Sequence, residues 1–313
     1  METKKAQVYQ STGSYYEIKD EEGQLWRARL KGRFKISKHA SRSNPIAVGD
    51  WVKFDIVEKE DHEAIIDDIL LRDNYIIRTS PQNRHQKHII ASNVDLACLI
   101  ITASQPITSM GFIDRFLITT QAFQINNLLV VNKADLLKGE VLKRYELIKE
   151  TYEAVGFEVI LVSAESGEGI EELKNHIKDK TVLFTGHSGV GKSTLINSLI
   201  PSFNLKVGKI SDGTGKGRHT TTFAEMFDMP DRLGGKIIDT PGIKEWGLQE
   251  VEQEELSHYF PEMVKLLNEC RFDNCLHVRE PQCAVKDAVE SGEIPVSRYE
   301  NYLIFLEELE RPF

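Results

Sequence analysis

The stretch "TVLFTGHSGVGKSTLINSLI", residues 181–200, decides the fold. Gly186 to Ser193 match the pattern Gly-x-x-x-x-Gly-Lys-Ser, with an apolar run before the match and a helix-like segment after it. Glycines let a backbone wrap closely around phosphate oxygens, and the N-terminus of the following helix adds positive potential. A strand, this loop and a helix in succession therefore predict a phosphate-binding α/β domain, and this context disfavours a chance match.

Each residue of this loop is expected to contact the phosphates of a nucleotide or the metal ion that accompanies them. Lys192 should reach the β- and γ-phosphates and is counted among the catalytic residues, and the Ser193 hydroxyl should ligate Mg²⁺. The predicted phosphate-binding residues are Gly186, His187, Ser188, Gly189, Val190, Gly191, Lys192, Ser193 and Thr194.

Apolar runs alternate with helix-like stretches on both sides of the phosphate loop. The runs fall at residues 94–104, 125–132, 157–164, 181–186 and 235–242. Because strands that alternate with helices form mostly parallel sheets covered on both faces, we expect an α/β domain over residues 73–245. Its phosphate-binding loops should lie at the carboxyl ends of the strands. Residues 73–90 are expected to form a polar connector at the start of this domain.

Two further segments follow the phosphate loop as in a nucleotide switch. "DTPG", Asp239–Gly242, comes after a strand-like run, where a switch needs a carboxylate near Mg²⁺ and a glycine N–H near the γ-phosphate. The glycine-rich segment 208–223 ends in threonines, of which Thr220 or Thr221 would supply a hydroxyl to the metal ion, and Thr221 is placed among the catalytic residues. The segment "DTPG" also fits a common turn, and the glycine-rich segment also fits a merely flexible loop.

The segment "NKAD", residues 132–135, follows another strand-like run and fits a guanine-reading motif. Asp135 can accept hydrogen bonds from guanine N1–H and the exocyclic amine, an arrangement of donors that adenine lacks. Asn132 would brace the surrounding loops, Lys133 would lie along the base, and Ala134 completes the motif. A four-residue match can be accidental, so its position after a strand carries the interpretation.

The order of these motifs along the chain is unusual. "SAESGEG", residues 163–169, follows the next strand, and the backbone N–H of Ala164, after Ser163, is placed to contact the guanine oxygen. The order is Asn-Lys-x-Asp, Ser-Ala, phosphate loop, threonines and Asp-x-x-Gly, whereas most guanine-nucleotide switches place the last three first. Because fold geometry depends on strand adjacency, a chain cut open in a surface loop can preserve the site. We therefore predict a circularly permuted domain.

Residues 6–70 contain five short strand-like segments separated by turn signals. Five such strands predict a small closed barrel over residues 1–72, of an OB-like or an SH3-like type, and OB folds commonly bind oligonucleotides.

The row of residues 27–42 in this region carries seven Lys or Arg and no acid. With Trp26 and Phe34 available to stack on bases, this row suits a surface that follows RNA phosphates. Strand alternation could instead spread the cations over both faces, and an uninvolved solvated face stays open as an alternative. The predicted RNA-binding residues are Arg27, Arg29, Lys31, Arg33 and Lys35.

Three cysteines and a histidine gather in one short segment near the end of the chain. Cys270, Cys275, His277 and Cys283 offer three thiolates and one imidazole, the tetrahedral set that structural Zn²⁺ favours over scattered free thiols. Four protein ligands leave no open position for chemistry. The segment lies in an acidic, mainly helical region, residues 246–313, which we expect to be a zinc-binding domain whose metal affinity contributes to folding.

The composition is that of an ordinary globular protein, with 313 residues, 41% hydrophobic residues and a formal charge of −9. The acidic balance argues against a protein that coats nucleic acid generally. No window approaches a membrane span and no leader pattern follows the first lysines, so we expect a cytoplasmic protein. Nothing in the sequence demands more than a monomer.

Taken together, the barrel, "NKAD", "SAESGEG", "GHSGVGKSTLIN", "GKGRHTTT", "DTPG" and "CRFDNCLHVREPQCAV" closely resemble the circularly permuted GTPases, and among them the small ribosomal subunit biogenesis GTPase A family. The resemblance covers nearly the whole chain. It implies an OB-fold barrel, a permuted P-loop GTPase domain using Mg²⁺ and a zinc-bearing helical domain. It also implies late maturation of the small (30S) ribosomal subunit, with GTP hydrolysis stimulated by that subunit. The implied partners are the subunit, its 16S-type rRNA and other assembly factors.

The position that follows Asp-x-x-Gly is held by Ile243, where Ras-like enzymes place a water-orienting glutamine. An aliphatic side chain cannot hydrogen-bond water, so hydrolysis by the chain alone should be slow. His219 in the switch segment is the best candidate for positioning the water. A group supplied by the partner and a merely solvated histidine remain the alternatives.

A second functional class stays open, namely a signalling switch whose barrel and acidic domain dock proteins. A zinc hydrolase is disfavoured because the four-ligand set has no open position. Because "DTPG" leads directly into the terminal domain, we also expect switch movement to reach that domain.

Overall fold

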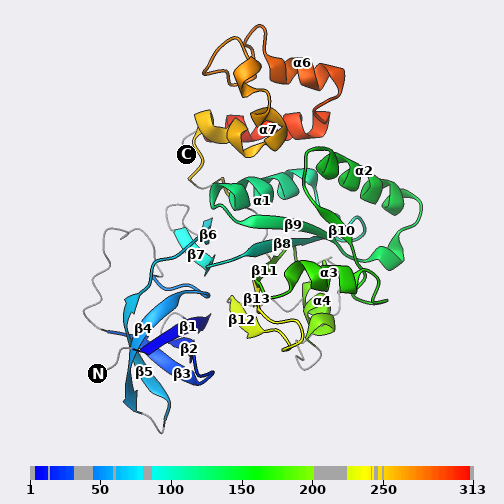
Figure 1. The fold of residues 1–313 in the computed structure, drawn as a ribbon. Coiled ribbons are helices and arrows are strands. Elements are labelled where there is room, and N and C mark those ends of the chain that lie inside the picture. Colours follow the sequence, from blue (N-terminus) through cyan, green and yellow to red (C-terminus); the bar gives the residue numbers. More distant parts are fainter. Residues whose placement is uncertain are drawn as a thin grey trace.

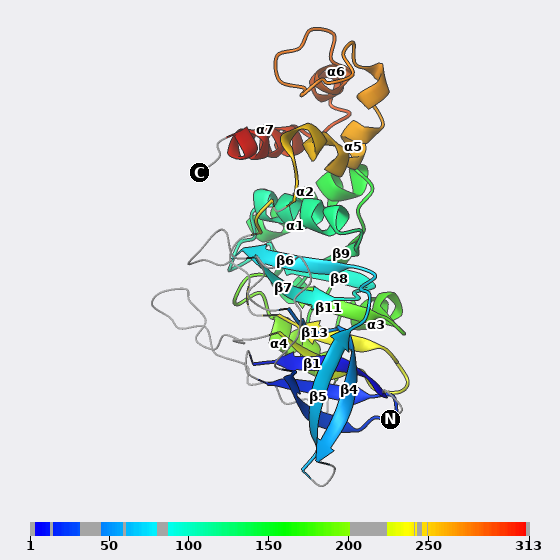
Figure 2. The ribbon, with the colours of Figure 1, turned by 90° about the vertical axis from the view of Figure 1, so that its left-hand side faces the viewer.

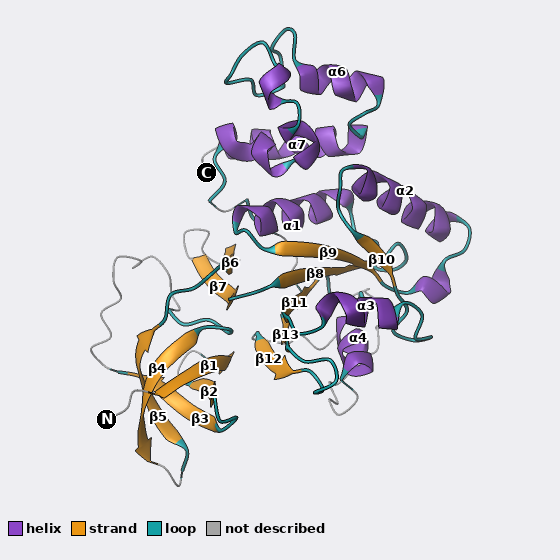
Figure 3. Ribbon diagram, viewed as in Figure 1, coloured by secondary structure: helices purple, strands orange, loops and turns teal. Residues whose placement is uncertain are grey.

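The computed structural model describes residues 4–12, 15–31, 45–58, 61–79, 87–200, 224–240, 242, 246–248 and 250–310. An N-terminal barrel and a C-terminal helical cluster lie at opposite ends of a central α/β part (Figures 1 and 2). The secondary structure of the described residues divides in the same way, with strands in the barrel and helices in the C-terminal cluster (Figure 3).

The barrel is formed by β1 (Lys4–Ser11), β2 (Tyr16–Asp20), β3 (Leu25–Leu30), β4 (Trp51–Glu58) and β5 (Glu63–Ile69). Neighbouring strands follow the order β1-β2-β3-β5-β4, and β4 pairs back onto β1, which closes the barrel. The pair β3–β5 is parallel and the others are antiparallel. This five-stranded arrangement is OB-like, which settles the choice between the two predicted barrel types.

Trp26 is part of the barrel core, which also contains Ile18, Phe54 and Ile66. Its side chain is 4% exposed and its Nε1 donates to Asp20 Oδ2 at 2.8 Å. The expectation that Trp26 stacks on bases was therefore wrong, because strand alternation turns residue 26 inward while residues 27 and 29 face solvent.

The central sheet confirms the predicted α/β domain. Its order is β10-β9-β8-β11-β13-β12, and all neighbours are parallel except β12 and β13. The strands are β8 (Leu96–Ile101), β9 (Asn126–Val131), β10 (Val159–Leu161), β11 (Thr181–Thr185), β12 (Glu225–Asp228) and β13 (Lys236–Asp239). The strand β12 was not predicted; its residues Met226 and Phe227 are both buried.

Helices cover both faces of this sheet, as expected. One apolar core joins it to α1 (Met110–Ala122) and α2 (Glu140–Ala154), and a second joins it to α3 (Ile170–Ile177) and α4 (Lys192–Leu199). A 3-10 turn, η1 (Ala134–Leu136), follows β9.

The segment expected to be a polar connector contains two antiparallel strands, β6 (Tyr75–Thr79) and β7 (Lys87–Ser92). Ile76, Ile77 and Ile89 are buried in the core that includes α1 and α2. The polar residues around these short apolar runs concealed the hairpin, whose stability depends on packing against the rest of the domain.

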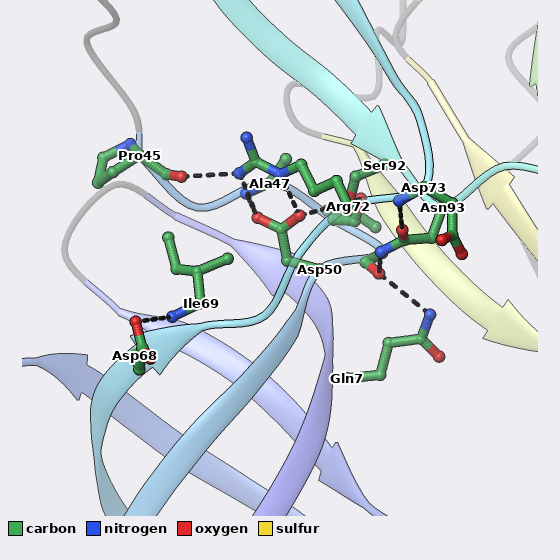
Figure 4. A network of polar contacts seen from close by, with 12 residues as sticks. Gln7, Pro45, Ala47, Asp50, Asp68, Ile69, Arg72, Asp73, Ser92 and Asn93 are labelled. Atoms are coloured by element: carbon green, nitrogen blue, oxygen red, sulfur yellow. Dashed lines mark hydrogen bonds and ion pairs between the residues drawn. The ribbon is translucent and has the colours of Figure 1, made fainter. Parts of the chain in front are cut away.

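A buried carboxylate fixes the barrel to this hairpin (Figure 4). Asp50 accepts hydrogen bonds from Arg72 Nε and Nη2, both at 2.6 Å, from Ser92 Oγ at 2.5 Å and from the Ala47 N–H at 2.8 Å. Because the carboxylate is fully buried and fully hydrogen-bonded, the barrel and hairpin are held as one unit.

The barrel is also joined to the central sheet through β12. Gln10 of β1 pairs with Glu225 of β12, so one continuous sheet runs from β10 into the barrel. Asp228 accepts from Tyr9 Oη at 2.7 Å and from Lys19 Nζ at 2.6 Å.

The C-terminal cluster contains η2 (Gln253–Tyr259), α5 (Pro261–Val264), η3 (Leu267–Glu269), α6 (Ala284–Ser291) and α7 (Val296–Glu310). The stretch before the cysteines was expected to be mainly helical, and it forms only short turns of 3-10 and α-helix, interrupted at Pro261, which lacks a backbone N–H. The helix α7 lies against α1, and the buried Ile118 of α1 belongs to the core of the cluster. Among the described residues, no helix is long and apolar enough to span a membrane.

Candidate functional site

The phosphate loop connects β11 to α4 and depends on glycine at two crowded positions. Gly186 has φ +146°, and a Cβ there would lie 2.2 Å from Ile100 O. Gly191 has φ +94°, and a Cβ there would lie 2.4 Å from Asn132 Nδ2. A larger residue would meet backbone at position 186 and would displace the Asn132 side chain at position 191, and the positive φ values disfavour it at both, so the glycines of the sequence pattern have a direct steric cause.

Lys192 begins α4 with its side chain folded back over the loop. Its Nζ donates to Gly186 O at 2.9 Å and to His187 O at 3.2 Å. Burial lowers the pKa of Lys192, while the charge of Asp239 acts in the opposite direction. Ser193 and Thr194 lie half-buried in the first turn of the helix. The loop thus places a cation and a hydroxyl at a helix N-terminus, as phosphate and Mg²⁺ binding require.

The guanine-reading motif lies beside the phosphate loop, although it comes much earlier in the chain. Asn132 Nδ2 donates to Val190 O at 2.9 Å, and Asn132 Oδ1 accepts from the Ala164 N–H at 3.1 Å. Lys133, at φ +72°, donates from Nζ to Gly189 O at 3.0 Å. Asn132 therefore ties together three loops, as the sequence suggested.

The carboxylate that would recognise guanine is oriented by a hydrogen bond from a neighbouring serine. Asp135 is exposed at the start of η1, and its Oδ1 accepts from Ser163 Oγ at 2.5 Å. Ala134 is buried behind it. The Ala164 N–H is already bonded to Asn132, so a contact with the guanine oxygen would have to share or replace that bond.

The switch residues that fall within the described part of the chain also reach this edge of the sheet. Asp239 ends β13 in register with Phe184 of β11 and is 1% exposed. Gly242 lies against the phosphate loop, since a Cβ on it would be 3.1 Å from Ser188 N. The other predicted switch residues, His219, Thr220, Thr221 and Ile243, lie outside the described residues.

Comparison with known proteins agrees with this geometry. The family model "RsgA GTPase" matches residues 69–249, and "RsgA N-terminal domain" matches residues 5–66. The chain belongs to the RsgA GTPase family. It is therefore a GTPase, which converts GTP to GDP and phosphate.

Relatives within the RsgA family match along almost their full length. "Small ribosomal subunit biogenesis GTPase RsgA" of Flavobacterium psychrophilum is 49% identical, over 96% of this chain and 91% of that protein. The protein of the same description from Cytophaga hutchinsonii is 47% identical, over 97% of this chain and 99% of its own length.

Solved structures that resemble this chain in sequence and fold confirm the fold. The crystal structure of YjeQ from Thermotoga maritima has a TM-score of 0.77 at 33% identity, covering 99% of this chain and 100% of that chain. The structure described as "YloQ, a circularly permuted GTPase" has a TM-score of 0.73 at 28% identity, covering 99% and 97%. The predicted circular permutation is confirmed.

The cysteine cluster of this RsgA-family chain brings its four donors together. The donor atoms of Cys270, Cys275, His277 and Cys283 all lie within 4.8 Å of one another. Cys270 Sγ is 3.9 Å from Cys283 Sγ, and His277 Nδ1 is 3.6 and 3.3 Å from those sulfurs. A tetrahedral zinc ion about 2.1–2.3 Å from its ligands requires separations of about 3.5–3.8 Å. The donor set therefore fits one zinc ion.

The protonation of these donors is linked to metal binding. Burial and the neighbouring cysteines raise the pKa of Cys275 to about 12, despite a backbone hydrogen bond that lowers it. Burial lowers the pKa of His277, which favours the neutral imidazole that a metal needs. Crowded thiols that resist ionisation by themselves are ionised when a metal ion compensates their charge.

The sequence did not reveal how the metal loop is supported. Glu280 accepts hydrogen bonds from the N–H groups of Leu276, Val278 and Arg279 at 2.8–2.9 Å. From α7, Tyr299 Oη donates to His277 O at 2.6 Å and Tyr302 Oη donates to Leu276 O at 2.8 Å. A glutamate three residues after the histidine and a Tyr-x-x-Tyr pair on a helix were the available signals.

The predicted RNA-binding row is only partly described. Arg27, Arg29 and Lys31 are exposed along the outer side of β3 and its end, so strand alternation collects these cations on one face. The guanidinium groups of Arg27 and Arg29 lie 3.9 and 4.4 Å from the ring centroid of Tyr15, and Lys31 pairs with Asp67. Arg33, Phe34 and Lys35 lie outside the described residues.

Proposed function

We propose that this chain is a GTPase of late small-subunit (30S) maturation, which binds the subunit and its 16S-type rRNA and couples GTP hydrolysis to its own release or that of other assembly factors. The observation that carries the proposal is the joint presence of a complete guanine-binding edge, an OB-like barrel and a four-donor metal cluster in one chain. Relatives described as "Small ribosomal subunit biogenesis GTPase RsgA" match over the same span.

At the nucleotide, the roles follow from position. Asn132, Lys133 and Asp135 bind guanine, with Ser163 orienting the Asp135 carboxylate. The phosphate loop from Gly186 to Thr194 wraps the phosphates. Ser193 and Asp239 would hold Mg²⁺, which would neutralise phosphate charge, and Gly242 would contact the γ-phosphate through its N–H.

For hydrolysis, Lys192 stabilises charge that develops on the phosphates, and Thr220 or Thr221, with Thr221 preferred, would supply a hydroxyl to the metal ion. His219 positions the attacking water in the place that Ile243 cannot serve. Because the chain contributes no glutamine at that position, turnover is slow until the subunit brings the switch into its active arrangement.

Cys270, Cys275, His277 and Cys283 hold one structural zinc ion, which would give the metal loop a fixed shape on α7. On the barrel, Arg27, Arg29 and Lys31, together with Arg33 and Lys35, bind RNA phosphates. The protein acts as a monomer in the cytoplasm, where subunits are assembled.

The test is sedimentation of the protein with purified small subunits in the presence of a non-hydrolysable GTP analogue or GDP, with GTP turnover measured in parallel. We expect co-sedimentation with the analogue, weaker co-sedimentation with GDP and faster turnover when subunits are added. Absence of both binding and stimulation would reject the proposal and favour a protein-binding signalling switch.

A further inference from the structure

One turn of α1 contacts three parts of the molecule that are far apart in the sequence. Phe112 packs on the phosphate loop, Asp114 binds the C-terminal cluster, and Phe116 packs on Trp246, which follows the Asp-x-x-Gly motif. The sequence prediction treated this helix only as a cover for the sheet.

The first contact is between Phe112 and His187, a residue of the phosphate loop. Their ring centroids are 3.8 Å apart at an interplanar angle of 28°, and the Phe112 side chain is 6% exposed. Ser109 caps the start of α1, with its Oγ accepting from the Phe112 N–H at 3.3 Å. A buried ring on a capped helix is a stiff support, so it restricts where the backbone of the loop can lie.

The loop that leads into α1 reinforces this contact. Lys133 Nζ donates to Gln105 O at 2.6 Å, and Pro106 lies 3.5 Å from the position of a Cβ on Gly189. The start of α1 is thus fixed against both the guanine-reading motif and the phosphate loop.

The second contact is a buried ionic cluster between α1 and the C-terminal elements. Arg298 of α7 donates to Asp114 Oδ1 at 2.6 Å and to Glu262 Oε1 at 2.8 Å. Asn301 Nδ2 donates to Asp114 Oδ2 at 2.5 Å, and Tyr152 Oη donates to Asp114 Oδ1 at 2.7 Å. Arg298 and Asp114 are 1% and 0% exposed.

Such a cluster tolerates little displacement. Separating Arg298 from Asp114 would leave the buried Asp114 carboxylate with only the neutral donors Tyr152 and Asn301, which is far more costly than breaking an exposed ion pair. The two contacts of α1 are two residues apart, about 3 Å along the helix axis, and a regular helix transmits a shift over that length with little loss.

We propose that α1 is a rigid link between the C-terminal cluster and the nucleotide, in which Phe112 positions the phosphate loop through His187 and the Arg298–Asp114 pair fixes the cluster to the same helical turn. The contact of the C-terminal cluster with α1 then changes the free energy of nucleotide binding. By reciprocity, nucleotide binding changes the free energy of that contact by the same amount. The link depends on guanine-nucleotide binding by this family and is independent of the proposed ribosomal role.

The first arm of the test measures the affinity for GDP by calorimetry. Phe112→Leu keeps an apolar side chain but removes the stacked ring, and we expect GDP affinity to fall about two- to tenfold. Phe123→Leu is the matched control, because Phe123 ends the same helix with a similar 8% exposure and packs on Tyr75. Equal losses in the two variants would overturn the positioning role of Phe112.

The second arm measures hydrogen exchange of residues 186–193 with GDP bound. Arg298→Lys keeps the charge but cannot engage Asp114 and Glu262 together in forked geometry. We expect faster exchange in the phosphate loop and weaker GDP binding, although neither carboxylate partner of Arg298 belongs to that loop. Faster exchange confined to residues 250–310, with unchanged GDP affinity, would overturn the link.

The third arm combines the two changes. If both act through α1, the Phe112→Leu, Arg298→Lys double variant should have the GDP affinity of Phe112→Leu alone, because the link is already broken. Losses that multiply would show two independent effects and reject the proposal. Should Arg298→Lys melt below the assay temperature, Asn301→Ala replaces it, since it removes one hydrogen bond to Asp114 without leaving a buried charge unpaired.

Discussion

Asn132 Nδ2 donates to Val190 O at 2.9 Å across a separation of 58 residues, joining the guanine-reading motif to the phosphate loop. In this permuted chain the two motifs stand in reversed order, so the bond depends on the adjacency of β8, β9 and β11 in the sheet. The site is assembled by the order of strands in space, which the cut in the chain leaves unchanged.

Replacing Asn132 by alanine should weaken both GDP and GTP binding. The variant leaves Val190 O and the Ala164 N–H without their partner, a loss on the order of 1–3 kcal/mol where such groups are buried. Calorimetric titration measures the effect. Asn126→Ala, at the exposed opposite end of β9, serves as the control and should bind nucleotide normally. Equal affinities for the two variants would contradict the bracing role of Asn132.

Gly191→Ala should weaken nucleotide binding, because the Asn132 side chain must move away from Val190 O, whereas Gly156→Ala should not. The two glycines have nearly the same φ, +94° and +93°, so the backbone strain of an alanine, about 1 kcal/mol, is common to both. A Cβ at residue 191 would collide with Asn132 Nδ2 at 2.4 Å, while nothing lies within 4 Å at residue 156. Thermal melting and nucleotide titration of both variants separate strain from collision. Unchanged nucleotide affinity in Gly191→Ala would disprove the steric argument.

Replacing Cys283 by serine should remove zinc and loosen the C-terminal cluster. The wild-type chain is expected to contain about one zinc per chain by atomic absorption, because four soft donors converge on one point. Cys98→Ala changes a buried cysteine outside the cluster and should keep its zinc. Limited proteolysis should then cleave residues 250–310 in the Cys283 variant but not in the control. An unchanged cleavage pattern after metal loss would show that the metal does not support this region.

Acid should weaken the joint between the barrel and β12. Burial by itself would raise the pKa of Asp228, but hydrogen bonds from Lys19 and Tyr9 outweigh it and the net pKa is lowered. A carboxyl group whose folded pKa lies below its unfolded value of about 3.9 stabilises the fold above that value and loses this contribution as pH falls through the folded pKa.

Asp228→Asn should therefore destabilise the protein at pH 7 and progressively less at acid pH, as the pH falls below the unfolded value of about 3.9 towards the lower folded pKa. Because Asp228 is partly exposed, the loss at pH 7 should be modest, about 0.5–1 kcal/mol. Urea unfolding at pH 7 and at acid pH measures it, and Asp231→Asn, on a nearby exposed turn, is the control. If the free energy of unfolding falls equally at both pH values, ionisation of Asp228 is not the cause of the loss.

His219→Ala should lower subunit-stimulated turnover by about 10²-fold or more while leaving GTP affinity within about twofold, as expected for loss of a group that positions water. Single-turnover hydrolysis with saturating subunits is the measurement. If subunit-stimulated turnover stays intact in His219→Ala, a group of the ribosome positions the attacking water instead.

The sequence was sufficient for those features that depend on local chemistry. The phosphate loop, "NKAD" and the cysteine spacing each have residue types fixed by a ligand, and the strands β8, β9 and β11 are continuous apolar runs of the kind a buried parallel sheet requires. Strand alternation placed Arg27 and Arg29 outside, but the same alternation buried Trp26, which had been given a surface role.

Features that depend on contacts across the fold were not predictable. Phe112 is an ordinary apolar residue of an amphipathic helix until the fold brings His187 against it. Asp114, Glu262 and Arg298 are distant charges in the sequence, and nothing local marks them as one buried cluster. The hairpin β6–β7 was missed for the same reason, because its isoleucines gain a core only from the assembled domain.

The order of the strands along the chain also determines the order in which they leave the ribosome during synthesis. The barrel, β1 to β5, emerges first, followed by β8, β9 and β10 with the guanine-reading half of the site. The strands β12 and β13 come last, and β12 takes its place between β13 and the already completed β1. Since domains generally fold in the order of their synthesis, a nascent chain would hold the base-recognition loops before it had any phosphate-binding loop. Nucleotide could then contribute to folding only after the phosphate loop has been made, in the steps where β12 and β13 join the central sheet to the barrel.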